Sequence, residues 1–185
     1  MNDQDRLTEP TIASETIYEG KVITVKVDDV RLPNGKTAKR EIVKHQGAVA
    51  VLPLTDDGKM IVVRQFRKAL ERTILEIPAG KLEKGEEPLA CAKRELEEET
   101  GYTAAQYEHL SSFYTSPGFA DELLHVYVAT GLQAGTMQPD EDEFVEMLEL
   151  TLEEAHEKHR TGEIRDAKTV LALFAWENRV LKARG

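Results

Sequence analysis

The amino-acid sequence predicts an α/β fold in which helices cover both faces of a mixed β-sheet, an α/β/α sandwich. Short apolar runs of strand length recur along residues 21–150. One helical pattern interrupts them at 86–100, and two more helices are expected at the end of the chain. Strands on both sides of a central helix favour a layered domain, which we expect at 46–185. Residues 1–45 are expected to form a separate N-terminal tail and small β region.

The N-terminal region contains one predicted hairpin. Apolar residues alternate along 21–31, and the strand pattern resumes at 38–45 after a Pro-Asn-Gly turn. Residues 1–12 show no such pattern and are expected to be a flexible or partner-docked tail. Because an isolated hairpin is only marginally stable in water, we expect this region to pack against another surface.

The next elements are a second hairpin, a short strand and a helix. Two apolar runs at 47–66 flank an Asp-Gly turn, and a short strand follows at 73–78. The helix at 86–100 carries Pro88 in its first turn, where proline is tolerated. Gly101 follows the helix, and glycine is the residue that most often ends a helix in the left-handed conformation.

The last third of the chain is predicted to hold three strands and two helices. The strand-like runs lie at 107–115, 123–129 and 144–150. Thr151 and Glu154 have the spacing of a capping box and predict a helix that ends near Arg160. Asp166 is expected to cap the final helix.

Charge and composition exclude several classes of partner. The chain has 24 Lys and Arg against 34 Asp and Glu, a formal net charge of −10. Nucleic acid and anionic membranes repel such a protein, so neither is expected as a partner. No apolar run approaches the roughly 20 residues of a membrane span, and no secretory signal is visible at the polar start. The single cysteine, Cys91, fits a reducing cytoplasm.

Acidic residues are concentrated at the end of the central helix. Glu95, Glu97, Glu98 and Glu99 occupy its last turns, although a helix C-terminus favours cations by about 0.3–1 kcal/mol per charge. Three of them lie beside the apolar stripe of the helix rather than opposite it. Converging carboxylates predict a site for a hard cation, Mg²⁺ or Mn²⁺, whereas a solvated acidic face is the alternative.

Residues 80–102 resemble the Nudix box, G-x5-E-x7-R-E-U-x-E-E-x-G-U, in which U is a bulky aliphatic residue. All seven fixed positions match, at Gly80, Glu86, Arg94, Glu95, Glu98, Glu99 and Gly101. Tyr102 replaces the last aliphatic residue. The resemblance implies a Nudix-type α/β/α sandwich that hydrolyses the pyrophosphate bond of a nucleoside diphosphate linked to another group.

The same resemblance implies the roles of the acidic residues. Metal ligands would be Glu95, Glu99, the carbonyl oxygen of Ala79 and, as an extra ligand, Glu143. Glu141 would be the general base on the attacking water, Glu98 a further ligand or a supporting group, and Arg94 would orient the glutamates through salt bridges. Residue chemistry alone does not separate Glu141 from Glu143, which lie in one acidic run, and such a run is often merely solvated.

A second motif narrows the substrate. Pro117 in the segment SPGFADE lies sixteen residues beyond Gly101. A proline at that spacing is similar to the mark of the ADP-ribose pyrophosphatase subgroup. By this resemblance Ser116, Pro117 and Gly118 line the substrate site and Glu122 contacts the substrate. The alternative is a plain Pro-Gly turn between two strands.

Three more residues complete the expected substrate site. Arg67 is expected to hold a substrate phosphate, because guanidinium groups fork onto phosphate oxygens; packing on the sheet is the alternative. Arg40 and Glu41 resemble positions that in this subgroup reach the adenine-side pocket of a neighbouring subunit. The resemblance therefore implies a homodimer to which residues 1–45 contribute.

Together these features lead to one expected function and two alternatives. The expected function is Mg²⁺-dependent hydrolysis of ADP-ribose to AMP and ribose 5-phosphate, with Mn²⁺ as a substitute metal, in the cytoplasm. One alternative is a Nudix hydrolase of another nucleoside diphosphate derivative, such as a sugar nucleotide or NADH. The other is a non-catalytic sensor that binds ADP-ribose.

Overall fold

The computed structural model describes residues 6–137 and 144–184. The chain divides into two compact units, of which the first consists of residues 1–47 and 113–123. The second unit consists of residues 48–112 and 124–185. The segment that joins the two long strands near the middle of the chain therefore belongs to the first unit.

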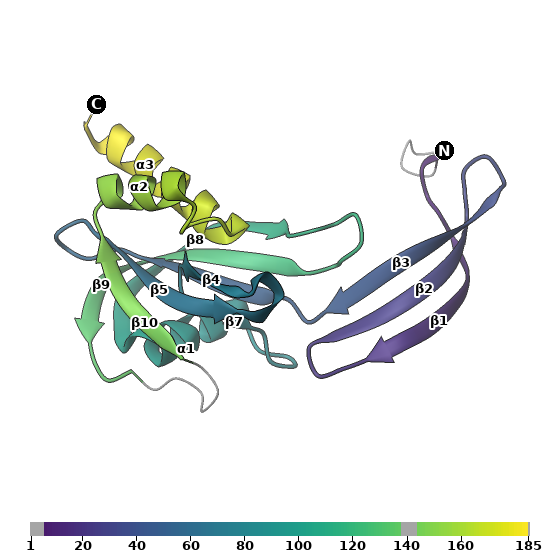
Figure 1. Cartoon of the computed structure of the whole chain (residues 1–185), viewed down its shortest axis with the longest axis horizontal. Helices are drawn as coiled ribbons and strands as arrows, with labels where there is room; N and C mark the ends of the chain where they lie inside the picture. Colours follow the sequence, from purple (N-terminus) through teal and green to yellow (C-terminus); the bar gives the residue numbers. More distant parts are fainter. Residues whose placement is uncertain (1–5, 138–143, 185) are drawn as a thin grey trace. The chain divides into compact units, whose positions relative to one another are not determined.

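The first unit contains a three-stranded antiparallel sheet in the order β1-β2-β3 (Figure 1). Its strands are β1 (Thr11–Glu19), β2 (Ile23–Arg31) and β3 (Thr37–His45). The predicted hairpin is confirmed as β2 and β3, which pair without a register shift. Strand β1 was not predicted, and the expected tail at 1–12 is wrong at Thr11 and Ile12, which begin this strand. Two register shifts break the alternation of β1, so the sequence lacks a clear strand pattern there.

The 113–123 segment packs against β3. The backbone N–H of Val43 donates to the Phe119 carbonyl at 2.7 Å, and that of Asp121 donates to the Val43 carbonyl at 3.2 Å. Lys44 forms an ion pair with the Asp121 carboxylate. The outer edge of β3 is thereby covered by this segment.

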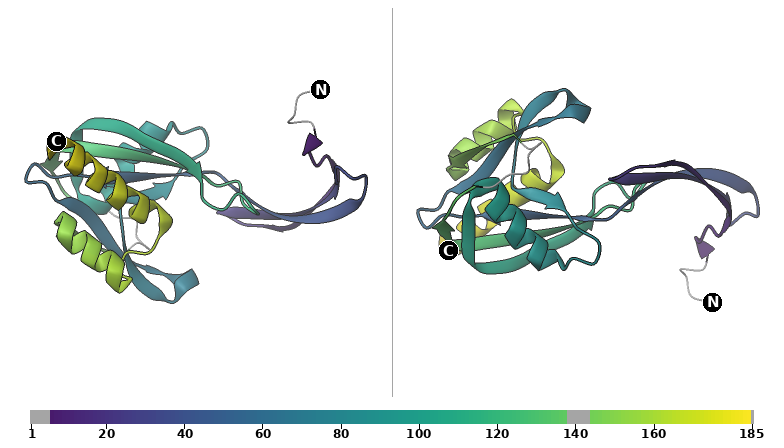
Figure 2. Two further views of the ribbon diagram at one scale, coloured as in Figure 1. Left: turned by 90° about the horizontal axis from the view of Figure 1, so that it is seen from above. Right: turned by 90° about the horizontal axis from the view of Figure 1, so that it is seen from below.

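The second unit is the predicted α/β/α sandwich. Its strands are β4 (Ala48–Pro53), β5 (Met60–Arg67), β6 (Arg72–Glu76), β7 (Ala79–Lys81), β8 (Tyr102–Tyr114), β9 (Leu123–Ala134) and β10 (Val145–Leu150). They form a sheet in the order β7-β4-β9-β8 and another in the order β10-β5-β6. The first sheet is mixed, because β4 pairs parallel with β9 but antiparallel with β7. Helix α1 (Pro88–Thr100) covers one face, and α2 (Leu152–Thr161) and α3 (Ala167–Arg184) cover the other (Figure 2).

The core fixes α1 against the central strand of the mixed sheet. All six residues of β4 are buried, and Val49 and Val51 pack against Cys91, Ala92 and Leu96 of α1. Burying a valine or leucine side chain contributes about 1.5–3 kcal/mol to folding, so the apolar face of the helix is held firmly against the sheet. The acidic positions beside that stripe are consequently held at the edge of the core.

The helix ends follow the sequence signals. Pro88 begins α1, and Gly101 ends it at φ 72°, where its N–H donates to the Glu97 carbonyl. The capping box of α2 is confirmed, with contacts in both directions between Thr151 and Glu154. Among the described residues, no helix is long and apolar enough to cross a membrane.

Candidate active site

Two glutamates of α1 reach the short strand β7. The Ala79 backbone N–H donates to Glu99 Oε2 at 3.1 Å. A Cβ on Gly80 would lie 1.8 Å from Glu95 Oε1, so that carboxylate fills the space beside the glycine. Glu95 and Glu99 are only 7% and 1% exposed. One turn of helix thus directs two buried carboxylates at two consecutive residues of one strand.

Arg94 binds the glutamates that surround it. Its Nε and Nη2 atoms both lie 3.1 Å from the Glu86 carboxylate. Its Nη1 atom donates to Glu95 Oε1 at 2.7 Å and to Glu98 Oε2 at 3.0 Å. The guanidinium lowers the pKa of Glu86 to about 2, and the carboxylates raise the pKa of Arg94. One cation therefore fixes the orientation of three carboxylates.

The local charge of this region favours a cation. Helix α1 has no basic residue in its last turn, where the helix dipole is negative. Three glutamates, Glu86, Glu95 and Glu98, contact the single guanidinium of Arg94, and the buried Glu99 lies on the same helix. A divalent ion at the β7 side of α1 would offset this negative charge, and the oxygen atoms there are of the kind that hard cations bind.

Comparison with known protein families gives this arrangement a name. The model of the NUDIX domain matches residues 44–173. The chain belongs to the Nudix family. The model of the nucleoside diphosphate sugar hydrolase N-terminal domain matches residues 9–43, which include the three-stranded sheet of the first unit almost completely.

Individual relatives resemble the chain over nearly its whole length. It is 62% identical over 169 residues to the ADP-ribose pyrophosphatase of Bacillus subtilis (strain 168), covering 90% of this chain and 91% of the relative. It is 57% identical over 167 residues to the methanol dehydrogenase activator of Bacillus methanolicus, covering 89% and 90%. A crystal structure of an ADP compounds hydrolase superposes with a TM-score of 0.83 at 25% identity and covers 97% of both chains.

The Nudix box residues fit a hard divalent cation but do not form a complete site by themselves. Nudix hydrolases generally need divalent metal ions. Among the described residues, no group of three Asp, Glu, His or Cys side chains is arranged to hold a metal ion. The donor set of Glu95, Glu99 and the β7 backbone is nevertheless all oxygen, as Mg²⁺ requires. Glu141 and Glu143 lie outside the described residues.

Arg67 contacts Glu76, a carboxylate that the sequence analysis did not predict as its partner. Its guanidinium binds Glu76 through two contacts, Nε to Oε1 at 2.6 Å and Nη2 to Oε2 at 2.8 Å. Glu76 is buried and also contacts Lys168 at the start of α3. The only sequence signal for this contact is a charged residue inside the apolar run TILEIP, where a buried charge requires a partner.

The other expected substrate residues belong to the first unit. The Glu122 carboxylate accepts a hydrogen bond from Thr115 Oγ1 at 2.6 Å, so Glu122 is held at the end of the SPGFADE turn. Within this turn the Ser116 carbonyl accepts from two backbone N–H groups, while Pro117 and Gly118 are exposed.

Arg40 and Glu41 lie in β3 of the same unit. The Nε and Nη2 atoms of Arg40 donate to the Glu9 carboxylate at 2.8 and 2.7 Å, and Glu41 is exposed to solvent. The residues expected to bind substrate are therefore divided between the two units: these two and the 116–122 turn are in the first, and Arg67 is in the second.

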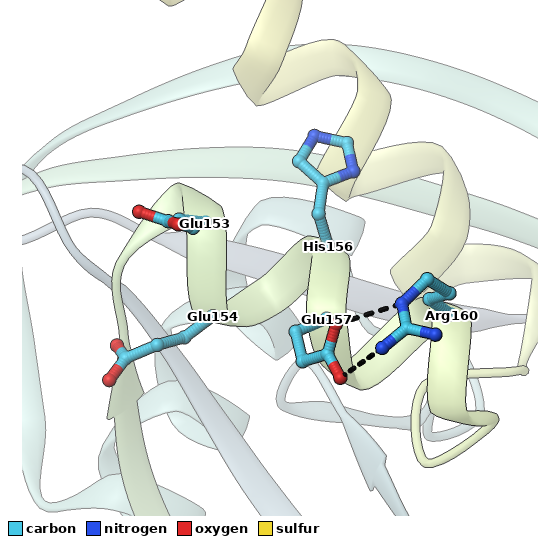
Figure 3. A pocket seen from close by; sticks show the side chains of 5 residues that line it. All are labelled: Glu153, Glu154, His156, Glu157 and Arg160. Carbon is cyan, nitrogen blue, oxygen red and sulfur yellow. Dashed lines mark hydrogen bonds and ion pairs between the residues drawn. The ribbon is translucent and has the colours of Figure 1, made fainter.

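A hollow along α2 is lined by residues that do not belong to the Nudix box. It is lined by Glu153, Glu154, His156, Glu157 and Arg160 (Figure 3). Glu154 closes the capping box, and Glu157 accepts two hydrogen bonds from Arg160, at 2.9 and 2.6 Å. Local helix contacts explain these charges, so we assign no role in diphosphate chemistry to the hollow.

Proposed function

We propose that the chain hydrolyses the pyrophosphate bond of ADP-ribose to AMP and ribose 5-phosphate with the help of Mg²⁺. The observation that carries this proposal is the 62% identity to an ADP-ribose pyrophosphatase over 90% of the chain. The Nudix box supports it, because Glu95 and Glu99 converge on β7 and Arg94 holds the neighbouring carboxylates in place.

The metal-binding part of the proposal uses residues of α1 and β7. Glu95, Glu99 and the carbonyl oxygen of Ala79 would hold the ion, and Glu143 would add a further ligand. When bound, such ions neutralise the diphosphate and activate the attacking water. Mn²⁺ would substitute for Mg²⁺, because both prefer oxygen ligands.

The protein side of the reaction divides into proton transfer and orientation. Glu141 would accept the proton of the attacking water as the general base. Arg94 would keep Glu95 and Glu98 in the orientation that its contacts at 2.7 and 3.0 Å define. Pre-positioned charge of this kind avoids reorganisation during the reaction and is a large part of enzyme catalysis.

Substrate binding would use the residues that the family resemblance assigns. Arg67 would contact a phosphate, and Ser116, Pro117, Gly118 and Glu122 would line the site. Arg40 and Glu41 would reach the adenine side of the substrate held by a second copy of the chain. Each of these roles belongs to a different residue, so each can be tested by a single substitution.

A homodimer and a cytoplasmic location are part of the same proposal. All nine residues of β1 are exposed, and Ile17 and Tyr18 are large apolar side chains among them. Exposed apolar strands of this kind are typical of protein interfaces, which supports a partner for the sheet of the first unit. A single buried cysteine, Cys91, is consistent with a reducing compartment.

A nucleoside diphosphate sugar is the second candidate substrate. The match of residues 9–43 to the N-terminal domain of nucleoside diphosphate sugar hydrolases favours it. The discriminating experiment compares kcat/KM for ADP-ribose, UDP-glucose and NADH with Mg²⁺ and identifies the products by chromatography. We expect ADP-ribose to be preferred and to give AMP and ribose 5-phosphate. Preference for UDP-glucose or NADH would identify another Nudix substrate, and binding of ADP-ribose without hydrolysis would indicate a sensor.

A further inference from the structure

Glu76 is a buried carboxylate with two cationic partners. Its side chain at the end of β6 is 2% exposed. Arg67 binds it from β5 through two hydrogen bonds, and Lys168 Nζ binds its Oε2 atom from the first turn of α3. Burial is the largest single effect on the pKa of Glu76 and raises it, but the hydrogen bonds and charges of Arg67 and Lys168 together outweigh burial and lower the pKa. The carboxylate is therefore ionised and held by opposite charge.

The two cations differ in how firmly the fold holds them. Lys168 is 13% exposed and has a second carboxylate partner, Asp166 Oδ2, at 2.9 Å. Asp166 is itself held at the start of α3, where it accepts the Thr169 N–H at 3.2 Å. The Arg67 side chain is 40% exposed. Lys168 is thus the fixed partner of Glu76, and Arg67 is the partner that faces solvent.

Arg67 also lies within the electrostatic field of the Nudix box. The charge of Glu99 contributes to the raised pKa of Arg67, after the larger effect of Glu76. Glu76 and Glu99 are connected through the short chain segment between β6 and β7, since Glu99 accepts the Ala79 N–H. The Arg67 guanidinium is half-exposed, so rotation of its side chain would bring it toward an anionic group that binds beside the box.

Removing the last cation from a buried carboxylate is strongly unfavourable, because the charge is then left without compensation. If Arg67 were the only partner of Glu76, a substrate phosphate would have to compete against that penalty. With Lys168 in place, Glu76 keeps one cation when Arg67 leaves. The second cation therefore removes the energetic penalty that release of Arg67 from Glu76 would otherwise carry.

We propose that Lys168 is a positioning residue that neutralises Glu76 and so frees Arg67 to bind a phosphate of the substrate. This inference rests on the proposed hydrolysis of a nucleoside diphosphate and assigns Lys168 no contact with it. Loss of the Lys168 charge is expected to lock Arg67 onto Glu76 and to weaken substrate binding. Loss of the Glu76 charge at the same time is expected to release Arg67 again.

The test is a double-mutant cycle on the full-length chain, with KM and kcat for ADP-ribose measured at saturating Mg²⁺. Lys168→Met is expected to raise KM about tenfold, a size typical of coupling between contacting charges, and to change kcat much less. In Glu76→Gln/Lys168→Met, KM is expected to return close to that of Glu76→Gln alone. Lys168→Arg is expected to retain the wild-type KM.

Two controls separate this role from a structural one. Lys158→Met removes another half-buried lysine that pairs with a glutamate, Glu163, and is expected to leave KM unchanged. Thr169→Val removes the hydroxyl that accepts the Ile77 N–H at 2.9 Å without changing any charge, and is expected to lower stability with no coupling to Glu76→Gln. Urea unfolding of every variant provides the stability values.

The possible results have distinct meanings. An unchanged KM in Lys168→Met, or additive losses in the double variant, would overturn the role of Lys168 while hydrolysis by the wild-type chain still supports the proposed function. A wild-type chain that does not turn over ADP-ribose contradicts the function instead, and the cycle is then run with the nucleotide that it does hydrolyse. If Lys168→Met fails to fold, the inference is tested with Glu76→Gln alone. Its KM is expected to equal the wild-type value or to be lower, and a higher KM would contradict the inference.

Discussion

The Glu95 carboxylate occupies the space in which a side chain at Gly80 would begin. A Cβ at position 80 would lie 1.8 Å from Glu95 Oε1 and 1.9 Å from its Cδ atom. Contacts below 3.0 Å do not occur between such atoms, so one of the two groups has to move. Gly80 therefore allows α1 to bring a carboxylate directly against the backbone of β7.

The first prediction tests this close approach. Gly80→Ala is expected to displace the Glu95 carboxylate and to lower kcat/KM for ADP-ribose by about 100-fold, a loss of roughly 3 kcal/mol of transition-state stabilisation. The effect is steric, because Gly80 does not have the positive φ that favours glycine. Gly85→Ala is the control for backbone strain: a Cβ at Gly85 meets nothing within 4 Å, but its φ of 81° disfavours alanine, so this variant is expected to lose stability and to keep most of its activity. Equal activity of the two variants would contradict the importance of this contact.

The second prediction concerns the pH dependence of folding stability. Arg94 lowers the pKa of Glu86 from 4.5 to about 2 in the folded chain. A lowered folded-state pKa stabilises the protein above the unfolded pKa, and this contribution is lost as the pH falls through the folded value. The difference in the free energy of unfolding between wild type and Glu86→Gln is expected to be constant above about pH 5 and to shrink between about 4.5 and 2.

Urea unfolding at a series of pH values measures this difference. Asp57→Asn provides the comparison on an exposed turn, because a hydrogen bond from Thr55 and then the contact with Lys59 also lower the pKa of Asp57. A stability difference for Glu86→Gln that grows as the pH falls would show that the Arg94 contact does not stabilise the fold.

The third prediction separates the two glutamates of the acidic run. Glu141→Gln is expected to lower kcat by several orders of magnitude with little change in KM, because a general base acts on the attacking water rather than on substrate binding. Glu143→Gln is expected to change the Mg²⁺ dependence. Single-turnover kinetics of both variants provide the comparison, and a large kcat loss in Glu143→Gln alone would reverse the two assignments.

The fourth prediction concerns assembly. Sedimentation equilibrium is expected to give the mass of a dimer for wild type, because β1 exposes Ile17 and Tyr18. Ile17→Asp is expected to weaken the dimer, since it would bury a charge in an apolar contact. Leu181→Asp changes an exposed apolar residue of α3 and serves as the control. A monomer in the wild type at micromolar concentration would also remove the support for Arg40 as a residue that acts in a second subunit.

Local signals account for the parts of the fold that the sequence predicts well. Pro88 and Gly101 mark the two ends of α1, and Thr151 with Glu154 marks the start of α2; each signal acts within one turn of helix. The Nudix box is predictable for the same reason, because its residues lie within 22 positions of the sequence and four of them, Arg94, Glu95, Glu98 and Glu99, are on α1.

Contacts between distant residues account for what the sequence does not predict. Strand β1 has an irregular register, and β7 is only three residues long, so neither shows a clear period. Lys168 lies 92 positions from Glu76, and no local pattern connects the two. Arg67 is predicted as a phosphate ligand from its residue type, but its contact with Glu76 depends on how β5 and β6 pair. Tertiary packing, rather than local chemistry, decides these features.

The most direct test of the proposed chemistry is a Mg²⁺ titration of ADP-ribose hydrolysis by wild type and Glu99→Gln. Glu99 is buried against Ala79, so the amide substitution keeps the shape of the side chain and removes its charge. The wild-type chain is expected to release AMP and ribose 5-phosphate only when Mg²⁺ is present, and Glu99→Gln is expected to lose about 1,000-fold in kcat while keeping its fold, as removal of a metal ligand predicts. Hydrolysis that persists in EDTA, or a Glu99→Gln rate near that of wild type, would contradict metal-assisted cleavage at this site.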